Sequence, residues 1–412
     1  MLYDKIRNAL LAAAGIAAMA AAAADFPVVE KTGKAIQSAI DAAHAAGGGR
    51  VVLDEGTYPS GTLYLKSHVE LHLKKGATIL GAGSPDGYDD VDDPRIGQKP
   101  ENSTKVFIAC IDSEDVAITG EGTIDGQGVK FYDTTTMRGK FFAKPPRPRT
   151  RMVEFFKCRN ILFEGVLFKD SPGWTFWIRD CENVTVSRIR IYGDQRMINN
   201  DGIDIDGCRH VRIGESDFKT GDDCVVMRAM RLQGKSMTCE DMVVSNCVLD
   251  SACQGIRLSC PSDDLIKDGL FKNLTFRGRN GVQSAHPRRY LAPWCQGHAR
   301  MQNMLFEDCT FDNWGSPISF WVEPGITLRE FGNVTFRNIK IRADRPIQLK
   351  GCAESVLRNI RFENVEGTVS AAQPIEMQSV ENVTFDNFRI TSGKGVPAQF
   401  DRGKSDSWES KR

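Results

Sequence analysis

Two short acidic segments in the middle of the chain contain the residues best suited to chemistry. One is Asn199–Asp204 (Asn-Asn-Asp-Gly-Ile-Asp), and the other is Thr220–Cys224 (Thr-Gly-Asp-Asp-Cys). Asp201 precedes Asp222 by 21 residues and Asp223 by 22. Carboxyl groups held close together repel one another, which raises at least one pKa and places a proton donor beside an ionised base. Cleavage of a glycosidic bond needs such a pair.

Clustered acids have two other common uses. Asp-Gly and Gly-Asp pairs often form turns, and we assign only that role to Asp204 and Asp206. Carboxylates also bind calcium. A turn, however, does not need two adjacent acids placed 21 and 22 residues after a third. The spacing therefore favours catalysis by Asp201, Asp222 and Asp223, with no cofactor and no metal.

The elements that must position these acids are short repeats. From about residue 105 onward, an Asn begins an alternating apolar pattern that usually reaches an aromatic residue three positions later. Copies of this unit begin at Asn160, Asn183, Asn273, Asn303, Asn333, Asn359 and Asn382. Adjacent copies are separated by 23 to 30 residues. Alternation indicates short strands, and a fixed period indicates stacked units that share one core.

This period selects the fold class. It leaves no room for the helices of a βαβ barrel, and a β-propeller blade needs about 40 residues or more. One coil of a parallel β-helix fits, with coils about 4.8 Å apart. We predict an all-β, single-stranded, right-handed parallel β-helix in which the repeated Asn residues stack as a ladder. Because about 22 residues make one coil, the three acids should meet on one face of adjacent coils.

The two ends of the chain have different compositions. Residues 1–24 begin with basic positions and continue as an Ala-rich apolar stretch to Ala24, which predicts a cleaved export signal and a periplasmic or secreted protein. The segment Thr32–Ala46 reads as a helix that caps the first coil. We expect one β-helix domain over residues 25–402 and a polar tail over residues 403–412.

Composition excludes several classes of protein. Lys+Arg and Asp+Glu are equal at 53 each, so no basic excess favours nucleic acid. We expect a monomer with no membrane span in the mature chain. Six of the twelve cysteines fall in or beside apolar strand patterns and should pack as small core residues. These six are Cys158, Cys181, Cys208, Cys224, Cys247 and Cys309. Cys295 and His298 lack the second ligand pair that a zinc site needs.

At these motifs the sequence resembles glycoside hydrolase family 28, the polygalacturonases and their relatives, over about Thr32–Phe388. The matching segments are Gly56–Tyr58, Gly76–Thr78, Ser171–Trp174, Asn199–Gly202 and Gly221–Asp223. The resemblance implies that Asp222 is the general acid and that Asp201 and Asp223 activate the attacking water, with inversion at the anomeric carbon. Inverting enzymes place the acid and base about 6.5–9.5 Å apart.

Two departures from the family pattern concern substrate binding. The family's Gly-His-Gly element is replaced by Cys253-Gln254-Gly255, and Gln254 can donate hydrogen bonds but cannot titrate. The family's Arg-Ile-Lys element, which grips a galacturonate carboxylate, is replaced by Gln283-Ser284-Ala285. The resemblance then implies a neutral sugar beside the cleaved bond, as in rhamnogalacturonan. Further candidates for binding the sugar chain are Asn199, Arg228, Arg257, His286, Arg288, Arg289 and Tyr290.

Four functions remain open from the sequence. The first is hydrolysis of a rhamnogalacturonan-like chain, and the second is hydrolysis of homogalacturonan if Arg288 and Arg289 replace the missing cations. The third is a β-helix polysaccharide lyase, which would release an unsaturated product. The fourth is a carbohydrate-binding or adhesive β-helix without catalysis, because a fold does not determine a function.

Overall fold

The computed structural model describes residues 24–395, except 98, 100, 101, 260, 261, 263 and 289–298, together with the backbone of 397–405. The predicted export signal therefore lies outside the described residues, except for Ala24. The strands gather into two compact units. Unit 1 comprises residues up to 200 with 209–217, and unit 2 comprises 201–208 with 218 onward. In the described part of the chain, no helix is long and apolar enough to cross a membrane.

Unit 1 is built from coils of three short strands. β7, β12 and β15 pair in parallel, as do β8, β13, β16 and β19, and β9, β14 and β17. The strands of unit 1 are β1 (Asp25–Pro27), β2 (Gly49–Leu53), β3 (Gly56–Pro59), β4 (Leu63–Tyr64), β5 (Val69–Leu73), β6 (Ala77–Leu80), β7 (Val106–Ile111), β8 (Glu114–Gly120), β9 (Thr123–Asp125), β10 (Met137–Arg138), β11 (Phe141–Phe142), β12 (Arg151–Phe156), β13 (Arg159–Glu164), β14 (Leu167–Lys169), β15 (Phe176–Arg179), β16 (Glu182–Ser187), β17 (Arg190–Tyr192) and β19 (Arg209–Gly214). Two short 3-10 helices, η1 (Pro85–Gly87) and η3 (Gly128–Phe131), join them.

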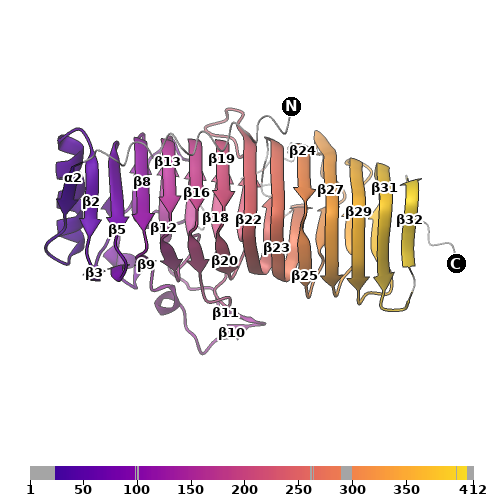
Figure 1. The fold of residues 1–412 in the computed structure, drawn as a ribbon, viewed down its shortest axis with the longest axis horizontal. Helices are drawn as coiled ribbons and strands as arrows, with labels where there is room; N and C mark the ends of the chain where they lie inside the picture. Colours follow the sequence, from indigo (N-terminus) through magenta and orange to yellow (C-terminus); the bar gives the residue numbers. More distant parts are fainter. Residues whose placement is uncertain are drawn as a thin grey trace. The chain divides into compact units, whose positions relative to one another are not determined.

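The predicted capping helix is confirmed as α2 (Gly33–Ala45), which lies beside β2 at the first coil (Figure 1). The Thr32 hydroxyl accepts a hydrogen bond from the Ala35 amide at 3.2 Å and so starts the helix. Ile36, Ile40 and Ala43 form its buried face. This face covers apolar residues that the first coil would otherwise expose.

Unit 2 has the same coil with longer strands, because β22 and β23 continue around the corners of the coil. Its strands are β18 (Ile203–Asp206), β20 (Asp217–Thr220, whose first residue falls in unit 1), β21 (Val225–Arg228), β22 (Thr238–Leu258), β23 (Leu265–His286), β24 (Arg300–Glu307), β25 (Thr310–Asn313), β26 (Ile318–Val322), β27 (Glu330–Ala343), β28 (Ile347–Lys350), β29 (Leu357–Val369), β30 (Ile375–Gln378), β31 (Val380–Ser392) and β32 (Pro397–Ser405). Among the described strands of unit 2, only β32 runs antiparallel to its neighbour, β31. Residues 403–405 of the predicted tail therefore lie in a strand.

The repeat pattern explains the core of unit 2. The aromatic residues of the last four repeats point inward and stack face to face with one another and with Phe271, at centroid distances of 4.4 to 5.5 Å. These four are Phe306, Phe336, Phe362 and Phe385. Such offset ring pairs add to the stabilisation from burial. The stack fixes the register from coil to coil, because a slip of one residue would turn every ring outward.

The predicted Asn ladder is confirmed in both units. Asn183 donates to Asn160 at 3.0 Å in unit 1, and Asn382 donates to Asn359 in unit 2. Asn273 donates to Asn246, which the repeat pattern did not include, at 2.8 Å. These Asn residues have φ of 52° to 57°, a left-handed conformation that Asn tolerates well. The Asn residues therefore turn the corner of each coil and join it to the next.

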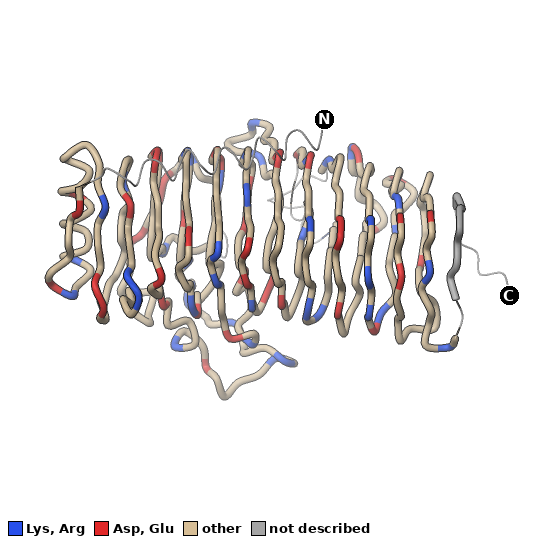
Figure 2. The backbone as a smooth tube through the Cα atoms, viewed as in Figure 1, with Lys and Arg blue, Asp and Glu red and all other residues tan. Residues whose placement is uncertain are grey.

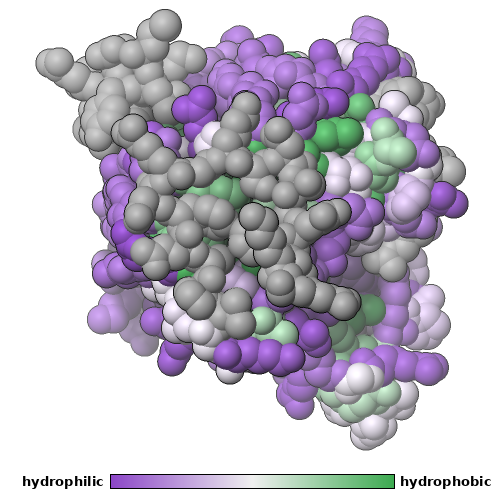
Figure 3. Space-filling model, turned by 90° about the vertical axis from the view of Figure 1, so that its right-hand side faces the viewer, coloured by the Kyte–Doolittle hydropathy of each residue, from purple (hydrophilic) through white to green (hydrophobic). Residues whose placement is uncertain are grey.

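The charged residues at the surface and the cysteines in the core are also distributed as the strand pattern predicts. Acidic and basic residues are interspersed along the strands of both units (Figure 2). Hydrophilic residues make up most of the coloured surface in the end-on view (Figure 3). The six cysteines predicted to lie in the core are buried and free, as expected. Both units thus have the right-handed parallel β-helix fold that the sequence predicts.

Candidate active site

The backbone of unit 2 brings the acidic segments together on adjacent coils. β18 and β21 pair in parallel, with Ile203 opposite Val225. The Gly202 amide donates to the Asp223 carbonyl at 2.8 Å. A Cβ atom at Gly202 would lie 2.2 Å from the Cys224 carbonyl oxygen, so only glycine allows this close approach. Asp201 and Asp223 consequently lie at the same position on neighbouring coils.

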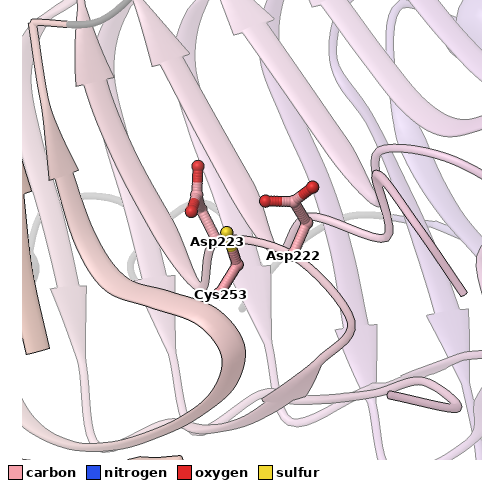
Figure 4. A group of neighbouring side chains, drawn as sticks. All are labelled: Asp222, Asp223 and Cys253. Carbon is pink, nitrogen blue, oxygen red and sulfur yellow. The ribbon is translucent and has the colours of Figure 1, made fainter. Parts of the chain in front are cut away.

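Hydroxyl groups hold the turn that carries the Asp-Asp pair. Thr220 and Ser251 each donate to the Asp222 carbonyl oxygen at 2.6 Å, and the Cys253 amide donates to the Ser251 hydroxyl at 2.8 Å. Oxygens of Asp222 and Asp223 and the sulfur of Cys253 lie within 4.8 Å of one another. Figure 4 shows these three side chains facing a common space. This group could also hold a metal ion, although the sequence predicts none.

Burial dominates the electrostatics of the inner acids. Asp201 is 4% exposed and Asp223 is 2% exposed, whereas Asp222 is partly exposed. Burial, followed by repulsion from Asp222, raises the pKa of Asp201 well above its ordinary value. Burial also raises the pKa of Asp223 to about 8, although the Arg257 guanidinium, 2.5 Å away, opposes this rise. The cluster therefore holds protons near neutral pH.

Two of the four arginines predicted to bind the sugar chain form ion pairs with buried acids. Arg228 is buried and forms an ion pair with Asp204, and Arg257 pairs with Asp223. The turn role predicted for Asp204 is wrong, because Asp204 lies fully buried inside β18. Burial raises its pKa to about 7, while Arg228 opposes the rise. Asp206 is also buried in β18, and its carboxylate accepts a hydrogen bond from the Met230 amide at 2.9 Å.

Gln254 and Asn199 are held by the protein. Gln254 is 4% exposed, accepts a hydrogen bond from Asn280 at 2.8 Å and donates to the Cys253 sulfur at 3.3 Å. Asn199 belongs to unit 1, where its side-chain oxygen accepts a hydrogen bond from Arg149 at 2.9 Å. The part played by Asn280 was missed in the sequence, although it precedes a Gly as Gln254 does.

The segment from His286 to Tyr290 was predicted to supply cations. His286 is 5% exposed, and burial lowers its pKa to about 4, so its ring is neutral. The ring contacts Phe331 edge-on and lies 3.0 Å from the Ser284 hydroxyl. Arg288 binds the carbonyl oxygen of Pro324 with its guanidinium. Arg289 and Tyr290 lie outside the described residues.

Comparison with known proteins agrees with the fold and with the resemblance to family 28. Residues 62–258 match the family model of glycosyl hydrolases family 28. The chain is 23% identical over 287 residues to polygalacturonase QRT2 of Arabidopsis thaliana, covering 65% of this chain and 61% of that protein. The chain therefore spans less than two thirds of that relative's length.

Solved structures show the same fold. A hyperthermoactive exopolygalacturonase from Thermotoga maritima superposes with a TM-score of 0.73 at 21% identity, covering 97% of this chain and 98% of that chain. An endo-xylogalacturonan hydrolase from Aspergillus tubingensis superposes with a TM-score of 0.57 at 15% identity, covering 90% of each chain. The fold is a parallel β-helix that these two enzymes share. Over residues 62–258 the chain is similar to glycoside hydrolase family 28.

Proposed function

We propose that this protein hydrolyses glycosidic bonds in a galacturonate-containing pectic polysaccharide. The observation that carries the proposal is the placement of Asp201, Asp222 and Asp223 on adjacent coils of one unit, in a chain that matches family 28. Burial and mutual repulsion raise the pKa of Asp201 and Asp223, so the cluster holds protons that acid–base cleavage can use.

We assign the catalytic roles of the three aspartates from the solvent exposure of their side chains. Asp222 is the most accessible of the three acids, so we assign it the transfer of a proton to the glycosidic oxygen as the bond to the anomeric carbon breaks. Asp201 and Asp223 accept a proton from the water that attacks the same carbon from the opposite face. The products are a leaving sugar with a new hydroxyl and a new reducing end of inverted configuration.

Two structural details bear on this mechanism. Burial favours resting protons on Asp201 and Asp223, and the mechanism needs Asp223 ionised, a state that the positive charge of Arg257 favours. The Asp222 and Asp223 oxygens lie within 4.8 Å. That is closer than the about 6.5–9.5 Å between the carboxyl groups of most inverting pairs. Proton NMR of the first product tests this point, because retention would make Asp223 a nucleophile.

For the substrate, we propose a chain with a neutral sugar on the leaving-group side, as in rhamnogalacturonan. Ser284 and Ala285, which replace the family's cations, are buried. His286 is neutral, Arg288 is bound to Pro324, and Arg257 is paired with Asp223. Within the described residues, none of these side chains offers a guanidinium or ammonium group to a carboxylate beside Asp222.

The test is digestion of homogalacturonan, xylogalacturonan and debranched rhamnogalacturonan, with analysis of the released oligosaccharides. We expect the fastest cleavage of rhamnogalacturonan and no change in this preference for Arg288→Ala. Faster cleavage of homogalacturonan, lost in Arg288→Ala or Arg289→Ala, would show that the carboxylate clamp has moved to this loop. An ultraviolet-absorbing product would indicate a lyase, and binding without new reducing ends would indicate an adhesive protein.

A further inference from the structure

A groove of about 730 Å³ crosses unit 2 beside the corner that follows the third strand of each coil. Its lining includes Asp250, Arg277, Asp312, Trp314, Arg342 and Asp344, which come from successive coils. Trp314 is 50% exposed and is the one exposed tryptophan in the described part of the chain. Half of its side chain is therefore open to solvent within the lining of this groove.

A cation lies against this ring. The guanidinium carbon of Arg279 is 5.9 Å from the centroid of the indole ring. Arg277 and Arg279 are exposed, and neither has a carboxylate partner among the residues that the structure describes. The neighbouring Arg342, in contrast, forms an ion pair with Asp312 at 2.5 Å. An aromatic face beside unpaired guanidinium groups suits a sugar ring that carries a carboxylate.

The register of the coils places this surface in line with the candidate active site. Val225 pairs with Ile256, Ile256 with Val282, and Val282 with Ile318. Each of these residues follows a corner residue by three positions. Those corner residues are Asp222, Cys253, Arg279 and Gly315, and Trp314 immediately precedes the last. With coils about 4.8 Å apart, Arg279 lies about 10 Å and Trp314 about 14 Å along the unit from Asp222.

We propose that Trp314 and Arg279 form a subsite for a uronate residue of the same polysaccharide chain, a few sugars away from the cleaved bond. This inference rests on the proposed function. The indole ring would stack on the apolar face of the sugar, and Arg279 would pair with its carboxylate. The subsite thereby holds long acidic chains in line with Asp222, and short ones do not reach it.

The experiment measures binding apart from hydrolysis. In the Asp222→Asn background, the affinities for short and long rhamnogalacturonan oligosaccharides are measured by calorimetry, with oligogalacturonates in parallel. We expect Trp314→Ala and Arg279→Gln each to weaken binding of the long chains about tenfold and to leave the short chains unaffected. Arg342→Gln is the matched control, because Arg342 is an exposed arginine in the same groove whose charge is already paired.

The outcomes separate this inference from the proposed function. Binding that depends on Trp314 and Arg279, without hydrolysis by the unmutated protein, would support the subsite and refute the activity. Hydrolysis with unchanged affinity in both variants would refute the subsite alone. Equal weakening for short and long chains would also refute it, because the two residues would then act at the cleaved bond. Arg279→Gln alters an exposed side chain, so it provides a folded variant even if Trp314→Ala is unstable.

Discussion

Asp223→Asn should change the pH dependence of stability in a direction and by an amount that the structure specifies. Burial raises the pKa of Asp223 from 3.8 to about 8 in the folded protein. Because this folded-state pKa lies above the unfolded value, the stabilisation from its proton is complete below about pH 4 and is lost as the pH rises to about 8. Within this window, stability falls by about 1.4 kcal/mol per pH unit. From pH 5 to pH 8 the free energy of unfolding therefore falls by about 4 kcal/mol because of Asp223. The Asp223→Asn substitution should remove this fall.

The assay is urea unfolding at several pH values between 5 and 8, with the unfolding free energy plotted against pH. Asp312→Asn is the control, because Asp312 is an acid of the same unit with 44% of its side chain exposed. The control should keep the slope of the unmutated protein, and Asp223→Asn should flatten it by about 1.4 kcal/mol per pH unit. Parallel lines for Asp223→Asn and the unmutated protein would refute our account of this buried acid.

Three further predictions concern the site and the coil. Asp222→Asn should lower turnover by about 10² to 10⁴-fold, the usual contribution of a general acid, while the partly exposed position leaves the melting temperature nearly unchanged; a rate near that of the unmutated protein on its best pectic substrate would contradict the role. Gly202→Ala should destabilise unit 2 by about 1–3 kcal/mol, because its Cβ would meet the Cys224 carbonyl oxygen at 2.2 Å, and unfolding in urea measures this. Asn364→Ala should cost about 1–2 kcal/mol, since it removes the ladder bonds to Asn338 and Asn387, each 3.1 Å long; an unchanged urea midpoint would contradict the ladder.

The repeat period carried most of the information about the fold. The spacing of the Asn residues predicted stacked coils, and in the structure the Asn positions of the last two copies form a ladder bond and the Phe positions of the last four form the ring stack. This worked because each coil packs on its neighbours, so that identical positions meet identical positions. The copy at Asn273 was placed out of register, because Asn303 donates to Asp268 and Phe306 stacks on Phe271. The helix α2 was equally predictable from the cap at Thr32 and the apolar spacing of Ile36 and Ile40.

The partners of the arginines could not be predicted from spacing. Arg228 and Arg257 follow the acidic and Gln elements closely, and a sequence does not reveal whether such a side chain reaches solvent or a buried acid. The strand position of Asp204, which was predicted to form a turn, could have been recognised in the sequence. Ile203, Asp204, Ile205 and Asp206 alternate as a strand does, and the structure has them in β18. The Asp-Gly turn signal nearby outweighed that alternation in the sequence interpretation.

If the protein cleaves a pectic chain as we propose, the charge of the site would favour a neutral sugar beside the cleaved bond. Four acids, Asp201, Asp204, Asp222 and Asp223, influence one another's ionisation, and Arg228 and Arg257 provide the opposing charges. A substrate carboxylate brought next to Asp222 would add a further negative charge. That charge would raise the pKa of Asp223 beyond about 8 and keep the base protonated. A neutral sugar avoids this cost. A cationic subsite some distance away, at Arg279 and Trp314, can then hold the acidic chain without disturbing the proton balance at the acids.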